Sequence, residues 1–389
     1  MRHIYLDYAA SAPLRELARE AEEAYEQSEI AGANPNSLHT LGRQAARALD
    51  GARRDIVRSL GGGFRPQDLA FTSGGTESNT LALHGLAAGA QERDRKRNRI
   101  VISAIEHDSE LDVAPSLRAE GFAVDLVRPN RAGIITPDAL EALIGSDVAL
   151  VSVMSANNET GMVQPIADLA KVAHQAGALF HTDAAQAAWR IPLADALTQV
   201  DAVSLAAHKI GGPVGIGALI VRGRTPLRPM TFGGGQENGR RPGTQDVRSA
   251  LAFAAAAKFC ASSLEETRST VAARAQGLYE LLCANGTGIE PTTSAQMGND
   301  RLPGIVSVMT RRLDSESLVL KLDQAGFEVS AGSACSSASL DASHVLLAMG
   351  ISRDIALGSL RVSFDERVAQ EDLDAFGQAL LQIVSESKH

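Results

Sequence analysis

Two charged residues follow apolar runs in the middle of the chain, and their types suit one kind of chemistry. Lys209 closes the run Ser204-Leu205-Ala206-Ala207-His208-Lys209, and Asp183 ends an earlier apolar run that begins at Gly177. An acid at the end of one buried strand and a lysine at the end of the next are what a pyridoxal phosphate (PLP) site needs. The lysine forms a Schiff base with the cofactor, and the carboxylate keeps the ring nitrogen protonated. The alternative interpretation of Lys209 is an ordinary surface lysine after a strand.

A glycine turn nearer the N-terminus is a candidate for holding the phosphate. The run Phe71-Thr72-Ser73-Gly74-Gly75-Thr76-Glu77-Ser78-Asn79 is typical of a strand, a turn and the start of a helix. Such a turn presents backbone N–H groups and the positive end of a helix dipole, which suit a phosphate. Thr76 adds a hydroxyl. The alternative is a simple helix cap made by Thr76.

Two further polar segments follow expected strands at the same edge of the sheet. His107 comes after the run 99–103, where it could stack on a planar ring or act as an acid or base near neutral pH. A structural histidine fits this position equally well. Asn157 and Asn158 come after the run 148–154, where an amide could orient a ring hydroxyl. Turn formation is the alternative, because asparagine and glycine both favour tight turns.

A cysteine and an arginine stand out in the last quarter of the chain. Cys335 lies in Gly332-Ser333-Ala334-Cys335-Ser336-Ser337-Ala338-Ser339, among small and polar residues, whereas Cys260 and Cys283 have apolar neighbours. We expect an accessible, loop-borne thiol, which is where nucleophilic cysteines are found; an unreactive surface cysteine is the alternative. Arg361 lies inside an apolar strand pattern and needs an anion. That anion is either a structural carboxylate or the carboxylate of a substrate.

The elements that must position these residues are those of an α/β protein. From about residue 68 to 220, short apolar runs alternate with helical patterns, which predicts a mostly parallel sheet covered on both faces. The expected helices of this region include 76–90 and 166–176. The expected strands are 68–72, 99–103, 123–126, 148–154, 179–182, 200–205 and 217–221.

The pattern of expected helices and strands changes after about Gly243. One long alanine-rich helical stretch is expected over 247–281. Beyond residue 300, strand patterns at 305–308, 328–330 and 360–364 mix with helical patterns at 315–325 and 370–385, as in an α+β unit. The sequence therefore predicts a large cofactor-binding domain over 15–260, and a smaller domain formed by 1–14 and 261–389.

Composition and charge limit the classes of function. Of 389 residues, 44% are hydrophobic and 21% are charged, which is ordinary for a globular protein. The net charge of −9 argues against general nucleic-acid binding and against an anionic membrane surface. Neither a secretory signal nor an apolar run long enough to span a membrane is visible. The three cysteines fit neither a disulfide framework nor a metal site, so we expect a cytoplasmic protein without a bound metal.

Taken together, these motifs resemble the cysteine desulfurases among the class V aminotransferase-like, fold-type I PLP enzymes. The resemblance is greatest to the nitrogen-fixation and iron–sulfur-cluster group. It runs from Tyr5-Leu6-Asp7-Tyr8-Ala9-Ala10 and Asn34-Pro35-Asn36-Ser37-Leu38-His39 to Arg361, nearly the whole chain. It implies a large domain with a mostly parallel seven-stranded sheet and a smaller α+β domain that carries the cysteine loop. It also implies removal of sulfur from L-cysteine, which yields L-alanine and a persulfide on Cys335 for transfer to an unidentified acceptor protein.

The resemblance implies roles for the residues around the cofactor ring. Lys209 would carry the Schiff base and remove the substrate's Cα proton. Asp183 would pair with the ring nitrogen, and His107 would stack on the ring and handle protons. Gln186 and Asn158 would form hydrogen bonds with the ring oxygen.

It implies further roles at the phosphate and at the substrate. Gly75, Thr76 and His208 would hold the phosphate. Thr244, in Arg241-Pro242-Gly243-Thr244, would reach the phosphate of the other subunit, which implies a homodimer with shared sites. Arg361 would bind the substrate carboxylate.

The sequence departs from the family pattern in three places. Ala206 stands where members usually have a phosphate-binding serine, so one hydroxyl contact is missing. The arginine is followed by Ser363-Phe364-Asp365-Glu366-Arg367 rather than serine-leucine-glycine-arginine, which we expect to alter the wall near the carboxylate site. The chain stops at His389, whereas housekeeping members carry a longer tail that helps dock the cluster scaffold.

Other activities fit parts of the pattern. A selenocysteine lyase and an aminotransferase share the fold, and the loop around Cys335 disfavours the aminotransferase without excluding the lyase. A non-catalytic scaffold that binds a sulfur-accepting partner is a more distant alternative. The presence of both Lys209 and Cys335 disfavours that scaffold.

Overall fold

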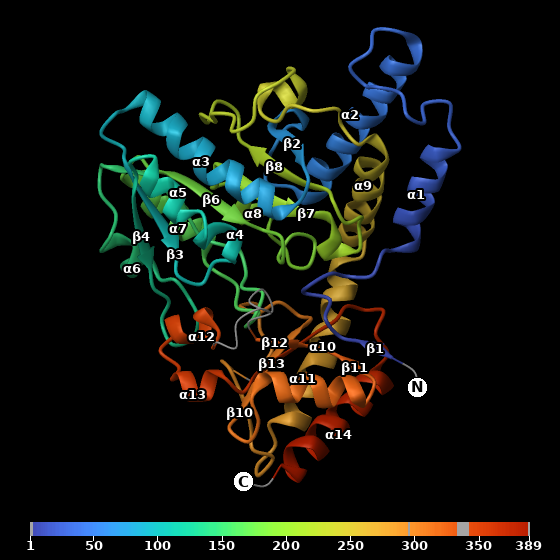
Figure 1. The fold of residues 1–389 in the computed structure, drawn as a ribbon, viewed down its shortest axis with the longest axis vertical. Helices are drawn as coiled ribbons and strands as arrows, with labels where there is room; N and C mark the ends of the chain where they lie inside the picture. Colours follow the sequence, from blue (N-terminus) through green and yellow to red (C-terminus); the bar gives the residue numbers. More distant parts are fainter. Residues whose placement is uncertain (1–2, 295, 333–341, 388–389) are drawn as a thin grey trace.

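The chain folds into two lobes joined by a bent pair of helices (Figure 1). The structure, a computed structural model, describes residues 3–294, 296–332 and 342–387. The upper lobe in Figure 1 contains the large sheet, and the lower lobe contains most of the elements that follow residue 263.

The large sheet has seven strands in the spatial order β2-β8-β7-β6-β5-β3-β4. Only β8 runs antiparallel to its neighbours, β2 and β7, and the other pairs are parallel. The predicted α/β fold with a mostly parallel seven-stranded sheet is confirmed, and each strand matches a predicted run. The bounds are β2 Leu69–Thr72, β3 Arg99–Ser103, β4 Ala123–Val127, β5 Val148–Ser152, β6 Leu179–Asp183, β7 Ala202–Ala206 and β8 Gly217–Val221.

Helices cover both faces of this sheet, because its strands carry apolar side chains on both. On β3, Ile100 packs in one buried cluster with Leu83 of α3 (Gly75–Arg93). Its neighbour Val101 points to the opposite face and joins a different cluster with Leu169 of α7 (Ile166–Gln175). The continuous apolar runs therefore mark strands that are buried on both sides.

The stretch expected as one helix over 247–281 is bent. It forms α9 (Val247–Ser262) and α10 (Leu264–Leu282), whose axes meet at 74° around Ser263. Helix α9 packs against α1 (Glu16–Glu26) and α2 (Thr40–Leu60), whereas α10 continues into the lower lobe (Figure 1). No single helix in the described ranges is long and apolar enough to cross a membrane, although this bent pair taken together has the necessary length and composition.

The lower lobe is built on an antiparallel sheet with the order β12-β13-β10-β9. The run 328–330, predicted as one strand, is split between β11, which pairs with β1, and β12 of this sheet. The strand bounds are β1 Ile4–Tyr5, β9 Ile289–Pro291, β10 Ile305–Thr310, β11 Phe327–Glu328, β12 Ser330–Ala331 and β13 Ser359–Ser363. The flanking helices are α11 Ser315–Gln324 and α14 Gln370–Glu386.

Two hydrophobic cores bear on the proposed domain division. Leu6 and Tyr8 share a buried cluster with Leu278 and Phe376, which supports assigning residues 1–14 and 261–389 to one smaller domain. Val345 on α12 belongs instead to the core of the large sheet. We therefore propose this division into two domains, in which the segment around α12 belongs to the smaller domain by sequence but packs against the large one.

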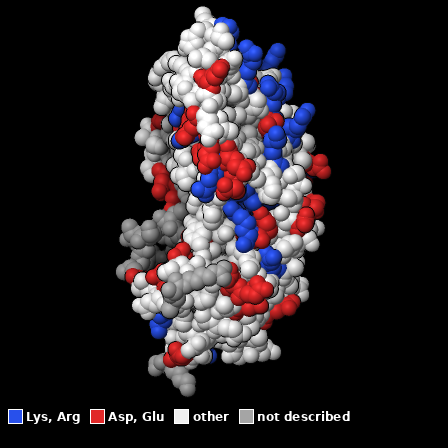
Figure 2. Space-filling view, turned by 90° about the vertical axis from the view of Figure 1, so that its right-hand side faces the viewer, with Lys and Arg blue, Asp and Glu red and all other residues white. Residues whose placement is uncertain are grey.

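The remaining helices are short and connect the strands. They are α4 Asp108–Leu111, α5 Ala114–Ala119, α6 Pro137–Glu141, α8 Ala194–Leu197, α12 His344–Ala348 and α13 Arg353–Ala356, with 3₁₀ turns at Pro66–Asp68, Ala207–Ile210 and Gln236–Gly239. On the face shown in Figure 2, acidic and basic side chains lie in neighbouring groups.

Candidate active site

A cavity of about 300 Å³ opens where the parallel strands end. Asp183 is the last residue of β6, Ala206 is the last residue of β7, and both line it. The carboxyl ends of parallel strands are where open α/β sheets bind ligands. The cavity brings together most of the predicted site residues: Gly75, Thr76, His107, Asn158, Asp183, Gln186, His208, Lys209 and Arg361.

Lys209 enters this cavity from the short 3₁₀ turn that follows β7. Its Nζ donates to the carbonyl oxygens of Ala9 at 2.7 Å and Ala10 at 3.0 Å, so the N-terminal segment holds the ammonium group. Gly211 ends the turn with φ of 79°, and a Cβ there would lie 2.9 Å from the Pro13 carbonyl oxygen. The chain can turn back beneath Lys209 only with glycine at this position.

Asp183 is held by two N–H donors. Oδ2 accepts from Nδ2 of Asn79 at 2.7 Å, and Oδ1 accepts from the backbone N–H of Ala185 at 2.8 Å. Two such donors suit a carboxylate. The residue is almost fully buried, so its charge acts through a medium that screens it weakly.

The same amide connects the acid to His107. Nδ2 of Asn79 also donates to Oγ of Ser109 at 2.9 Å, and that oxygen lies 2.9 Å from Nδ1 of His107. The backbone N–H of Ser109 donates to Nδ1 as well, at 3.0 Å. Because a backbone N–H can only donate, Nδ1 is an acceptor and the neutral ring carries its proton on Nε2. Burial lowers the pKa of His107 against the opposing charge of Asp183, which favours this neutral ring.

The phosphate end of the cavity lies at the start of α3. Gly74 is the N-cap residue and no side chain caps the helix, so the alternative in which Thr76 caps it is wrong. A Cβ on Gly75 would lie 3.5 Å from the Cβ of Ala206, which places the missing hydroxyl of the family pattern beside this turn. Burial lowers the pKa of His208 to about 4, with Lys209 adding to the effect, so this ring is neutral at physiological pH.

The two asparagines after β5 divide the predicted roles between them. The side chain of Asn157 is buried and forms the turn: Oδ1 accepts from the backbone N–H groups of Glu159 at 3.0 Å and Thr160 at 2.8 Å. Asn158 lines the cavity instead. Gln186 also lines it, and its Nε2 donates to the Ala9 carbonyl oxygen at 2.8 Å.

Arg361 is fully buried in β13 and already has one anionic partner. Nη2 lies 2.7 Å from Oδ1 of Asp7, and Nη1 donates to the backbone carbonyl of Asn158 at 3.1 Å. Its Nε has no hydrogen-bond partner among the described residues. The structural carboxylate considered for this arginine is therefore Asp7, and the side chain still borders the cavity.

Two predicted site residues are not placed in this cavity. Thr244 is exposed and does not line it in its own chain. Cys335 lies outside the described residues.

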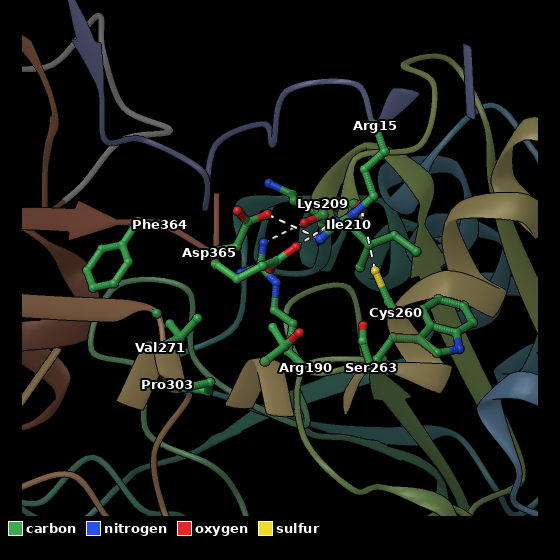
Figure 3. Close-up of a pocket in the computed structure, with 14 residues that line it drawn as sticks. Arg15, Arg190, Lys209, Ile210, Cys260, Ser263, Val271, Pro303, Phe364 and Asp365 are labelled. Carbon is green, nitrogen blue, oxygen red and sulfur yellow. Dashed lines mark hydrogen bonds and ion pairs between the residues drawn. The ribbon is translucent and has the colours of Figure 1, made fainter. Parts of the chain in front are cut away.

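The two acidic residues that depart from the family pattern after Arg361 do not lie where they were expected. Asp365 and Glu366 do not line the main cavity; they border a second cavity of about 40 Å³, which shares Lys209 with the first (Figure 3). Nη1 of Arg15 lies 2.6 Å from Oε1 of Glu366, Nη2 lies 3.3 Å from Oδ2 of Asp365, and Nε donates to the carbonyl of Ile210 at 2.9 Å. These two acidic residues form an ion cluster with Arg15 behind the lysine and are not part of the lining of the cavity that Arg361 borders.

Sequence reasoning missed Asn79, Ser109 and Arg15. Asn79 lies one turn beyond Gly75 on α3, so the helical period already places it on the side of the turn that faces the cavity. Ser109 follows His107 by two residues, a spacing typical of local hydrogen bonds. No comparable signal exists for Arg15, whose partners are about 350 residues away.

Comparison with known proteins assigns this arrangement to a family. The family described as aminotransferase class V matches residues 4–376. The chain belongs to this family.

Similar proteins narrow the resemblance within class V. The IscS-like cysteine desulfurase of Mycobacterium tuberculosis is 38% identical over 99% of this chain and 97% of its own length. The cysteine desulfurase IscS of Dictyoglomus turgidum is 35% identical over 98% of this chain and 95% of its own. A solved NifS-like protein superposes with a TM-score of 0.88 at 31% identity, covering 99% of this chain and all of that one. The predicted membership of the cysteine desulfurase group of class V enzymes is confirmed.

Proposed function

We propose that the protein is a PLP-dependent cysteine desulfurase that converts L-cysteine to L-alanine and keeps the sulfur as a persulfide on Cys335. The observation that carries the proposal is the joint placement of Lys209 and Asp183 in one cavity with Arg361 at its border. A lysine and a buried carboxylate are the two groups that PLP chemistry requires of a protein. The names of the full-length relatives support the substrate.

The described residues fit the cofactor. Oδ1 of Asn79 is buried without a hydrogen-bond partner among them, and a polar atom left this way is satisfied when a donor binds nearby. The first N–H groups of α3, at Gly75 and Thr76, face the cavity without a side-chain cap and suit the phosphate. Lys209 would hold the aldehyde carbon, and Asp183 would hold the ring nitrogen. When bound, PLP supplies a ring that accepts electrons from the substrate's Cα.

The residues around the ring have separable tasks. Lys209 leaves the Ala9 and Ala10 carbonyl oxygens when it reacts, and its freed amine moves the Cα proton. Asp183, oriented by Asn79, keeps the ring nitrogen protonated. His107 holds its proton on Nε2. Together these groups provide one acid, one base and one electrostatic anchor.

Arg361 and Cys335 act on the substrate. Arg361 would hold the substrate carboxylate through the edge that Asp7 leaves open. The Cys335 thiolate would attack the substrate sulfur: a sulfur–sulfur bond forms, the carbon–sulfur bond breaks, and its electron pair goes to the carbon. That carbon then takes a proton and alanine leaves. The sequence context of Cys335 supports this step.

The assembly and the partners are also proposals. We propose a homodimer in which the exposed Thr244 reaches the phosphate of the other subunit, because Thr244 does not line the cavity of its own chain. A sulfur-acceptor protein, as in iron–sulfur cluster biogenesis, follows from the relatives' names. The cytoplasmic location stays a prediction.

Three variants test the proposed function. Lys209→Ala should lose the absorbance of lysine-linked PLP and all alanine release. Cys335→Ala should keep that absorbance but lose sulfide and persulfide formation. Cys283→Ala is the matched control, since this half-buried thiol has a pKa raised to about 11 by burial and lies outside the cavity, and it should keep both. Unchanged desulfuration by Cys335→Ala would contradict the assignment.

A selenocysteine lyase is separated by its substrate. Alanine release from L-cysteine and from L-selenocysteine is compared at equal concentrations. We expect release from L-cysteine, and release from selenocysteine alone would favour the lyase.

A further inference from the structure

A chain of buried polar side chains crosses three strands of the large sheet beneath the cavity. Oε2 of Glu110 on α4 lies 2.5 Å from Oγ of Ser152 on β5, which lies 2.8 Å from Nδ1 of His181 on β6. Nε2 of His181 lies 2.9 Å from Oγ of Ser204 on β7. All four residues have no solvent exposure. None of these four residues has a role in the proposed function.

The chain lies directly under the acid that would hold the cofactor ring. His181 and Asp183 are two residues apart on β6, so their side chains point to the same face of the sheet. Ser204 is the residue on β7 that pairs in register with Asp183. The polar chain is thus the next layer below Asp183, one pleat farther from the cavity.

Electrostatics determine which groups of this layer are charged. Burial raises the pKa of Glu110 to about 8, and the nearby Asp183 adds to the effect. Burial also raises the pKa of the neighbouring Glu106 well above its usual range, and it lowers the pKa of His181 to about 3. These are the titratable groups that face Glu110. At neutral pH Glu110 and His181 are therefore uncharged.

One set of hydrogen-bond directions satisfies every contact in this state. Ser152 Oγ donates to Oε2 when Glu110 is ionised; when Glu110 is protonated, the same contact can reverse, so that Glu110 donates to Ser152, Ser152 donates to Nδ1 of His181, and the Nε2–H of His181 donates to Ser204. If Glu110 loses its proton, Ser152 must turn and donate to the carboxylate. His181 then keeps its contact with Ser152 only as the Nδ1–H tautomer.

We propose that Glu110 is a positioning residue that acts through Ser152 and His181: it leaves the layer beneath Asp183 uncharged at neutral pH and adds a negative charge to it when it ionises, and so sets how strongly the site holds the proton of the bound cofactor. The effect on the cofactor rests on the proposed function. The charge state of the layer does not, because it is a property of the folded chain alone.

The first test uses the protein without added cofactor. Thermal midpoints of the wild type, Glu110→Gln and Glu106→Gln are measured between pH 5 and 9. A carboxyl whose folded pKa is raised costs stability as the pH rises from its ordinary value of 4.5 to the folded value. The difference in thermal midpoint between Glu110→Gln and the wild type should therefore increase up to about pH 8 and then stay constant. The difference for Glu106→Gln, the other buried acid, should continue to increase.

Ser152→Ala separates the hydrogen-bonded chain from simple packing. The bond to Ser152 is the contact that stabilises ionised Glu110. Without this bond, the pH above which the difference in thermal midpoint stays constant should be higher. The comparison uses Ser152→Ala with and without Glu110→Gln. The proposal would be overturned if Glu110→Gln changed the thermal midpoint by the same amount at every pH, either in the wild type or in Ser152→Ala.

The second test uses the PLP-loaded protein. The absorbance of the Lys209-linked cofactor is titrated in the wild type, Glu110→Gln and Glu106→Gln. In the wild type, ionisation of Glu110 adds a negative charge that holds the cofactor's proton. Glu110→Gln should therefore lower the midpoint by roughly half a pH unit or more, and Glu106→Gln should leave it in place. Equal midpoints in the wild type and Glu110→Gln would overturn the link to the cofactor. A protein that takes up no PLP overturns the proposed function and that link, whereas the cofactor-free measurement still decides the charge state of the layer.

Discussion

Nδ2 of Asn79 donates to Oδ2 of Asp183 at 2.7 Å, and this bond joins the first helix after the glycine turn to the acid at the end of β6. The same nitrogen donates to Ser109, which contacts His107. The acid and the histidine of the proposed site are therefore oriented by one amide. Asn79 is a positioning residue for both.

Asn79→Asp should impair the site without changing the size of the side chain. A second carboxylate beside Asp183 cannot ionise freely, so the pair shares a proton and the ring nitrogen loses its full counter-charge. We expect alanine release to fall at least about tenfold, measured with PLP in excess. Ser109→Ala is the control: it removes the hydroxyl contact to His107 but keeps the backbone contact and the bond from Asn79 to Asp183, and should cost less. Equal rates for Asn79→Asp and the wild type would contradict this role.

Ala206→Ser should tighten PLP binding. The Cβ of Ala206 faces the turn at Gly75, and a hydroxyl there adds a hydrogen bond to a charged phosphate. Such a bond contributes about 1.5 kcal/mol or more, which is roughly tenfold in Kd. The measurement is fluorescence titration of the cofactor-free protein with PLP. Ala207→Ser, whose side chain faces Gly212, is the matched control and should leave Kd unchanged. Equal effects of the two serines would argue against the phosphate position.

Arg15→Met should destabilise the protein. Arg15 is buried between Asp365 and Glu366, so its removal leaves Glu366 as a partly buried, unpaired carboxylate, whereas Asp365 keeps its ion pair with Arg367; the loss costs about 3 kcal/mol. The free energy of unfolding in urea measures the loss. Arg19→Met, on the helix α1 that follows Arg15, removes a solvent-exposed ion pair and should change stability by less than about 0.5 kcal/mol. A similar cost for both variants would contradict the stabilising role of the buried ion cluster.

Glu159→Gln should stabilise the protein more at higher pH. Burial raises the pKa of Glu159 to about 7, although Ser343 donates to it at 2.5 Å. The raised value means that stability falls as the pH rises from about 4.5 to about 7, and the glutamine variant lacks this fall. Unfolding at pH 5 and pH 8 should show the larger gain at pH 8.

Glu77→Gln should change stability with the opposite pH dependence. Burial of Glu77 acts to raise its pKa, but the ion pair with Arg241 and the hydrogen bonds from Ser73 together outweigh burial, and the pKa is lowered. Glu77 therefore contributes stability above its ordinary pKa, and this contribution disappears as the pH falls. The loss caused by Glu77→Gln should shrink at acid pH. Parallel pH curves for the two glutamine variants would contradict both assignments.

The large sheet and much of the site were predictable from local patterns. Each strand of that sheet is an apolar run, and polar residues such as Asp183 and Lys209 follow directly where strands end. Because parallel strands end at one edge, their neighbours in sequence become neighbours in space. Thr76 was misread as a possible cap because the helix starts one residue earlier, at Gly75.

Contacts between distant segments were not predictable in this way. The partners of Arg15 follow β13, and Asp7 reaches Arg361 across most of the chain. The bend at Ser263 was also missed, because both helices consist largely of good helix formers and the break only passes the chain from one lobe to the other. Tertiary packing, rather than helix propensity, decides these features.

The most direct measurement of the central claim is the product balance of the purified, PLP-loaded protein with L-cysteine. The account predicts one sulfur for each alanine, counted as protein persulfide plus the sulfide that an added thiol releases from the persulfide by reduction. It also predicts that both products disappear in Lys209→Ala. Pyruvate in place of alanine, or alanine without any sulfur product, would contradict the account.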